Sequence, residues 1–154
     1  MTHVSPDDFR GALGSWAAGV AVVTTRHEDL VYGITVSSFA SLSVDPLLVL
    51  VCLANTNRIP GMIRDSGRFA ISMLADDQEE VSRYFASSGR EPALDFEGEF
   101  GTIEWHTGSP IIDGAIAHLD RELHELLPGG DHTIAVGRVL AAAFDAGRKP
   151  LVNF

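Results

Sequence analysis

Residues 33–54 read GITVSSFASLSVDPLLVLVCLA, and this stretch decides the fold. Residues 33–38 are rich in β-branched and apolar side chains. Residues 47–53 form an almost continuous apolar run, which is typical of a strand buried on both faces. The Asp45-Pro46 pair between them indicates a turn, because a proline pushes the preceding residue out of the helical region. The sequence therefore predicts two strands joined by a loop.

Hydroxyl groups crowd the loop that is predicted between these strands. They belong to Thr35, Ser37, Ser38, Ser41 and Ser43. Hydroxyls and loop amides beside a buried strand are costly unless they find hydrogen-bond partners. A flat, polar ligand with many acceptors, such as a flavin, would supply those partners. An ordinary solvated loop is the alternative, since serine-rich turns between strands are common.

Length and composition predict one globular domain over residues 1–154. Hydrophobic residues make up 45% of the chain, yet no apolar run approaches the roughly 20 residues that span a bilayer. The N-terminal sequence MTHVSPDDFR lacks the basic and apolar regions of a signal peptide, so we expect a cytoplasmic protein with no membrane partner. The single cysteine, Cys52, argues against a disulfide framework and a thiolate metal site.

The formal net charge of −10 argues against a nucleic-acid partner, because nucleic acids are bound by clustered cations. A phosphorylated small molecule needs only a local cation or a few amide donors. Several arginines fall in the middle of the chain, where we expect any phosphate pocket: Arg58, Arg64, Arg68, Arg83 and Arg90.

Hydrophobic spacing and turn residues predict the remaining elements. Strands are expected at residues 17–25, 69–74, 103–106 and 132–144. Helices are expected at residues 9–16, 60–66 and 77–86, with loops at residues 55–59 and 87–101. Gly67 would end the second helix, and Asp76 with Glu79 has the spacing of a capping box for the third.

Residues 115–127 are ambiguous. Ile116, Leu119, Leu123 and Leu126 recur at steps of three and four, which favours an amphipathic helix. A strand would have Arg121 interrupting an otherwise apolar face. If the segment were helical, His118, Glu122 and His124 would share one face, a weak candidate for a metal site.

Many short strands with few helices suggest an antiparallel barrel. The sequence has no GxGxxG after a strand and no GxxxxGK[ST], so neither a dinucleotide-binding βαβ unit nor a P-loop is available. A nucleotide cofactor would have to be held by strand edges and loops.

Four segments together resemble the flavin reductase-like family, the FMN-binding split-barrel proteins that serve two-component monooxygenases. They are FRGALGSWAAGVAVVTT (residues 9–25), the opening stretch, GRFAISMLADDQ (residues 67–78) and GDHTIAVGRV (residues 130–139). The resemblance covers nearly the entire chain, in the family's order and spacing. It implies a mainly β fold, a six-stranded antiparallel Greek-key split barrel with short flanking helices. It also implies a homodimer, and it implies that residues 115–127 are a strand.

The resemblance further implies where the cofactor binds. The matching positions on the first strand lie along the flavin ring, the neighbouring strand end is close to it, and residues 56–58 touch the phosphate. The positions expected to bind FMN, or FAD, are Thr35, Val36, Ser37, Ser38, Ser41, Cys52, Leu53, Ala54, Thr56, Asn57, Arg58 and Phe85. No metal is expected.

His132 matches the family histidine that lies near the nicotinamide of NADH or NADPH, so it is the expected catalytic residue; a histidine bonded only to its own turn is the alternative. The implied activity is an NAD(P)H-dependent flavin reductase that supplies a separate oxygenase. Hydride passes from nicotinamide to flavin, so no protein nucleophile is needed.

Four positions depart from the family pattern. Asn57 and Ile59 replace hydroxyl residues near the phosphate, and Ser37 replaces a common asparagine. Asn153 stands where a tyrosine can cover the nicotinamide. This motivates an alternative: a flavin-binding split barrel that holds flavin as a fixed prosthetic group and does not use NAD(P)H. A haem- or deazaflavin-binding split barrel is a weaker alternative.

Overall fold

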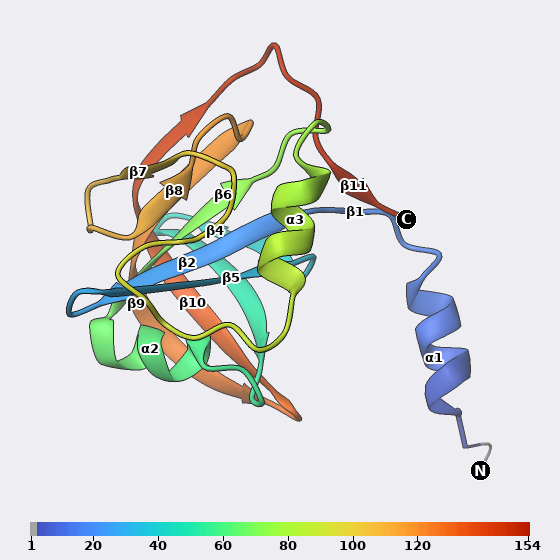
Figure 1. The fold of residues 1–154 in the computed structure, drawn as a ribbon. Coiled ribbons are helices and arrows are strands. Elements are labelled where there is room, and N and C mark those ends of the chain that lie inside the picture. The colour runs from blue at the N-terminus through green and yellow to red at the C-terminus, as the bar shows by residue number, and fades with distance from the viewer. Residues whose placement is uncertain (1–2) are drawn as a thin grey trace.

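The computed structural model describes residues 3–154, which fold around one seven-stranded antiparallel sheet with the order β3-β2-β6-β9-β10-β5-β4 (Figure 1). Its strands are β2 (Ala21–His27), β3 (Leu30–Val36), β4 (Phe39–Val44), β5 (Leu47–Ala54), β6 (Arg68–Met73), β9 (Ala117–Gly129) and β10 (His132–Phe144). Two short antiparallel pairs accompany it: β1 (Ala18–Gly19) with β11 (Val152–Asn153), and β7 (Thr102–Glu104) with β8 (Pro110–Ile112).

The sheet is rolled around its main core. Val23 of β2, Phe69 of β6, Val51 of β5 and Ala135 of β10 belong to one buried cluster, although β2 and β5 lie towards opposite edges of the sheet. A flat sheet could not bring these strands to a common core. A second cluster, which includes Phe85, lies beneath the helix α3 (Glu79–Ala86).

The segment expected to be a hydroxyl-rich loop is mostly a strand. Residues 39–44 form β4, which pairs with β5 from Phe39 opposite Val51 to Val44 opposite Leu47. The main sheet consequently has seven strands, one more than the six expected. The predicted turn at Asp45-Pro46 is present, because β4 ends at Val44 and β5 begins at Leu47.

β5 is present as predicted, but it is not buried on both faces. Val49, Val51 and Leu53 are buried, whereas the alternating Leu48 and Cys52 are only half-buried. The buried set points into the rolled sheet, and the other face is only partly covered. The apolar run therefore reflects one core face and one partly exposed face.

Residues 117–129 form strand β9, so the helix that periodicity favours is wrong. β9 pairs with β6 and β10, and its register against β10 shifts between Val136 and Gly137. There β9 has one extra residue, since Val136 is opposite Glu125 and Gly137 is opposite Leu123. Such a bulge reverses the alternation of side chains. Leu123 and Leu126 consequently both contact the main core at a spacing of three, which imitates a helix.

Residues 3–154 contain three eight-residue helices: α1 (Pro6–Leu13), α2 (Ile59–Ser66) and α3. α1 begins earlier than predicted because Ser5 caps it, and it extends away from the barrel with no buried residue (Figure 1). α2 ends as predicted at Gly67, which has the positive φ of 69° that favours glycine. No helix in this part of the chain is long and apolar enough to cross a membrane.

The predicted capping box of α3 is wrong. The helix begins at Glu79, and the Gln78 side chain turns back to accept a hydrogen bond from the Ala75 amide. Asp76 is held elsewhere, because its amide donates to the carbonyl of Lys149.

Residues 103–106 are only partly a strand. β7 ends at Glu104 and pairs with β8, which was not predicted.

Candidate functional site

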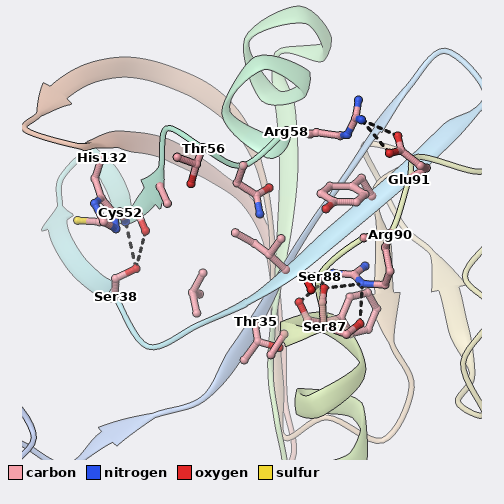
Figure 2. A pocket seen from close by; sticks show the side chains of 18 residues that line it. Thr35, Ser38, Cys52, Thr56, Arg58, Ser87, Ser88, Arg90, Glu91 and His132 are labelled. Atoms are coloured by element: carbon pink, nitrogen blue, oxygen red, sulfur yellow. Dashed lines mark hydrogen bonds and ion pairs between the residues drawn. The ribbon is translucent and has the colours of Figure 1, made fainter.

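A pocket of about 610 Å³ opens between the free edge of β3, the end of β5, the start of α2 and the loop that follows α3 (Figure 2). Most of the positions expected from the sequence line it, although they come from five separate segments. These lining positions are Thr35, Val36, Ser38, Cys52, Ala54, Thr56, Asn57, Arg58, Phe85 and His132.

Three expected binding positions lie outside this pocket. Leu53 is fully buried and points into the main core, because it alternates with Cys52 and Ala54 along β5. Ser41 is exposed on β4, beyond the turn that carries Ser38. Ser37 is exposed and faces two other hollows on the far side of that turn. Their expected side-chain contacts with a ligand in this pocket are not supported by this placement.

The hydroxyls of Thr35 and Ser38 already have protein partners. Thr35 Oγ1 donates to the Ser82 carbonyl at 2.6 Å. Ser38 Oγ donates to the Cys52 carbonyl at 2.7 Å and accepts from the Cys52 amide at 3.3 Å, as Figure 2 shows. The prediction that these two hydroxyls need a ligand to satisfy them is therefore wrong. Ser38 instead fixes the turn after β3 against the end of β5.

The backbone of β3, unlike the hydroxyls of Thr35 and Ser38, has groups free to bond a ligand. The amide of Val31 donates to Ala93, and the carbonyl of Gly33 accepts from Arg90, so odd-numbered residues of β3 point away from β2. In an antiparallel pair the bonding direction alternates with each residue. The amide and carbonyl of Thr35 therefore point the same way, along the edge that lines the pocket.

The end of β5 presents a second free edge. β4 pairs with β5 only as far as Val51, and the Asn55 amide points towards β10, where it donates to the Asp131 carbonyl. By the same alternation the Ala54 amide points away from β10 into the pocket. Two strand edges thus converge on one cavity.

The start of α2 forms the third wall. Asn57 Oδ1 accepts a hydrogen bond from the Ile59 amide at 3.0 Å, so this side chain orders the first turn of the helix. Arg58 is exposed at the mouth of the pocket, where its Nη2 contacts the Glu91 carboxylate at 2.7 Å (Figure 2). A helix N-terminus beside a cation suits a bound anion.

His132 lines the opposite side of the pocket at the start of β10. Its Nδ1 lies 2.7 Å from Asp131 Oδ1, and a carboxylate can only accept, so Nδ1 carries the hydrogen. That hydrogen bond from His132 lowers the pKa of Asp131 below its usual value. In the neutral imidazole, Nε2 is then an acceptor. The ring is 44% exposed and accessible to a ligand.

The comparisons with known proteins agree with one another. Residues 13–154 match the family described as flavin reductase like domain. The chain belongs to this family. A curated relative, the NADH-dependent flavin reductase of a Rhodococcus species, is 41% identical over 155 residues, covering 99% of this chain and 84% of the relative. Another, the reductase subunit HsaB of a flavin-dependent monooxygenase from Mycobacterium tuberculosis H37Rv, is 38% identical, covering 96% and 77%.

A solved structure confirms the fold of this flavin reductase-like protein. The NADH:FAD oxidoreductase SgcE6 of Streptomyces globisporus superimposes with a TM-score of 0.90 at 33% identity, covering 99% of this chain and 93% of that one. The mainly β split barrel that the resemblance implied is therefore confirmed, as is the resemblance itself.

The sequence placed Arg90 among five mid-chain arginines expected near any phosphate pocket, but it did not predict that the loop after α3 forms a wall of the site. Arg90 lines the pocket, and its Nη2 donates to the carbonyls of Gly33 and Phe85 at 2.9 Å. Its guanidinium also lies 5.2 Å from the ring centroids of Tyr32 and Tyr84. The only signal was an arginine beside a glycine in the SSGRE run, which does not reveal contacts with residues far away in the sequence.

The metal site considered at His118, Glu122 and His124 required a helix, and these residues lie on strand β9. The hypothesis is therefore wrong. His118 packs beside Ser72, at 3.3 Å from its Oγ, and burial lowers the pKa of this histidine. Glu122 pairs with Arg138 instead. In residues 3–154 no three His, Cys, Asp or Glu side chains are grouped to hold a metal ion.

Proposed function

We propose that this protein is an NADH-dependent flavin reductase that supplies reduced flavin to a separate monooxygenase. The observation that carries the proposal is the convergence of two unpaired strand edges, an N-terminal helix turn with Arg58, and His132 on one pocket. The relatives named above are a flavin reductase, a monooxygenase reductase subunit and an NADH:FAD oxidoreductase.

The pocket fits a flavin by the chemistry of its walls. Amides such as those of Thr35 and Ala54 can donate to the carbonyl and nitrogen edge of the ring, and donors aimed there stabilise negative charge as it develops. Tyr32 and Phe85 add apolar surface on the neighbouring wall. Thr56, Asn57 and Arg58 lie where the phosphate would bind. FMN is the flavin we propose, and FAD remains the competing ligand.

A bound flavin supplies the hydride acceptor in this chemistry, and the protein supplies position and orientation. The Ser38–Cys52 contacts hold the two strand ends at a fixed separation. Asp131 fixes the tautomer of His132, which leaves Nε2 free to accept a hydrogen bond from the carboxamide of the nicotinamide. His132 thus orients NADH, or NADPH, and needs no nucleophilic role.

The proposal includes a homodimer. Large apolar side chains are exposed on the neighbouring strands β4, β5 and β10, where a monomer would leave them in water. They are Leu42, Val44, Leu47, Leu140 and Phe144. Light scattering at micromolar concentration should give twice the chain mass, and Val44→Glu combined with Phe144→Glu should reduce it. A single-chain mass for the parent would contradict the dimer.

The decisive experiment is anaerobic spectroscopy. Purified protein with one equivalent of FMN should lose the visible absorbance of oxidised flavin when NADH is added, much faster than FMN with NADH alone. A protein that perturbs the flavin spectrum but does not accelerate reduction would support the alternative, a flavin-binding barrel that does not use NAD(P)H. Asn153, which motivated that alternative, pairs with Ala18 on β1 and does not line the pocket.

A further inference from the structure

The Glu91 carboxylate lies at the mouth of the pocket, beside the Arg58 cation that a flavin phosphate would need. Both carboxylate oxygens of Glu91 contact the same nitrogen of Arg58, Nη2, at 2.7 and 2.8 Å. Glu91 is the one acidic side chain that lines the pocket within the described part of the chain. Figure 2 shows the pair joining the start of α2 to the loop after α3.

The position of Glu91 is fixed by its neighbour in the sequence. Arg90 is tied to the carbonyls of Gly33 and Phe85 and, through Nε, to the carbonyl of Ser87 at 3.3 Å. These bonds anchor the loop to β3 and to the end of α3. Glu91 therefore faces Arg58 from an anchored loop. The pair itself is solvent-accessible, with side-chain exposures of 66% for Glu91 and 55% for Arg58.

Arg58 can receive a phosphate without leaving Glu91. The carboxylate engages only Nη2, and within residues 3–154 neither Nε nor Nη1 of Arg58 has a hydrogen-bond partner. A phosphate monoester carries a charge of about −1.5 to −2 at pH 7. Two anions would then share one guanidinium, so the carboxylate both competes for the cation and repels the phosphate.

We propose that Glu91 weakens the hold of the pocket on the flavin phosphate and so speeds release of the flavin. The inference rests on the proposed function, because a protein that hands reduced flavin to another enzyme must let it go. Glu91 is then a residue that sets affinity and release through the phosphate, without contact with the flavin ring.

Glu91→Gln tests this, because glutamine keeps the length and an acceptor for Arg58 while it removes the charge. The dissociation constants for FMN and for riboflavin, which lacks the phosphate, should be measured by titration, and the FMN release rate by stopped flow. We expect FMN to bind about three- to tenfold more tightly and to leave correspondingly more slowly. Riboflavin binding should be unchanged.

The matched control is Glu79→Gln, which removes the charge that faces Arg83 in an exposed pair on α3 with the same 2.7 Å contact. It should leave FMN affinity as in the parent. In the Arg58→Gln background, Glu91→Gln should lose most of its effect, because the shared cation is gone.

Three results would overturn the inference. FMN affinity could be the same in Glu91→Gln and the parent, or riboflavin binding could tighten as much as FMN binding, or the control could give the same gain. These leave the proposed function intact. If the parent binds neither FMN nor riboflavin, the proposed function itself fails, and this inference fails with it.

Discussion

Arg121 extends into the interior of the barrel through the space that Gly137 leaves open on the neighbouring strand. A Cβ atom at Gly137 would lie 2.2 Å from Arg121 Cδ and 2.9 Å from Phe69 Cζ. The guanidinium stacks 4.6 Å from the centroid of the Phe69 ring and is fully buried. Nη2 donates to the Leu119 carbonyl at 3.3 Å, whereas Nε and Nη1 have no partner within the described residues. A cation therefore lies within an apolar core.

Gly137→Ala should lower the free energy of unfolding by about 2–3 kcal/mol, because the added methyl group overlaps the stem of Arg121. Denaturant unfolding of the parent, Gly137→Ala, Arg121→Ala and the double variant forms a thermodynamic cycle. We expect the double variant to lose less than the sum of the single losses, since alanine at 121 removes the closest contact. Strict additivity would contradict this packing.

Arg121→Met should raise the free energy of unfolding by about 1–2 kcal/mol at pH 7. A buried charge with few partners costs more than an apolar side chain of similar length. Loss of the arginine leaves the nearby Asp120 carboxylate with hydrogen bonds from the amide and hydroxyl of Thr107. Of the two buried charged groups, Arg121 has the more unsatisfied hydrogen-bonding atoms within the described residues. A clearly less stable variant would show that the Phe69 contact outweighs the cost of burying the charge.

The advantage of Arg121→Met should also depend on pH. Desolvation by burial lowers the pKa of Arg121 to about 9. Above that pH the folded state binds fewer protons at this site than the unfolded state, so the site's contribution to stability rises with pH. The difference between variant and parent should therefore narrow between pH 8 and 10.5, and groups common to both proteins cancel. A constant difference would mean that Arg121 stays charged in the fold.

The sequence predicted some elements well because their signals are local. β10 spans residues 132–144 as expected, since its apolar run begins at a glycine turn and no bulge disturbs that boundary. β9 could not be recognised from periodicity, because the bulge near His124 changes the phase of its side chains and depends on pairing with β10. The resemblance to known proteins identified it instead.

The sequence likewise predicted part of the candidate site and not the rest. Ten of the expected positions line the pocket because they lie at or near the ends of strands and helices that the sequence marks. The roles of the hydroxyls were misjudged, since the partners of Thr35 and Ser38 are backbone groups 47 and 14 residues away. Arg90 was expected only as one of several arginines near a phosphate pocket, and its anchoring role was not predicted, because its contact with Gly33 spans 57 residues. Long-range hydrogen bonds leave no trace in local spacing.

Ser38→Leu should weaken FMN binding at least tenfold, or about 1.4 kcal/mol. The larger side chain occupies the pocket and removes both contacts that tie the turn to Cys52. Titration of FMN against parent and variant measures this, with Ser43→Leu on β4 as the control outside the pocket. Superimposable curves for parent and Ser38→Leu would place the flavin elsewhere.

His132→Ala should keep the affinity for FMN but raise the Michaelis constant for NADH. This is expected because the lost contact would stabilise bound NADH equally in the ground state and in the transition state. His124→Ala, an exposed histidine on β9, serves as the control. The assignment is wrong if FMN affinity falls in His132→Ala while the Michaelis constant for NADH stays the same. In that case the imidazole would contact the flavin.

The reduced flavin should leave the protein. The pocket is bounded by strand edges, loops and an exposed ion pair, and it opens to solvent beside Arg58 and Glu91. A reduced flavin kept in such a site would be lost to oxygen unless it were passed to an acceptor. We therefore expect dissociation constants in the micromolar range or weaker, which is about −8 kcal/mol at 1 μM. Anaerobic titration with oxidised and with reduced FMN measures both. Nanomolar values for both forms would show that the flavin is a fixed prosthetic group, and the protein would then act on a substrate of its own.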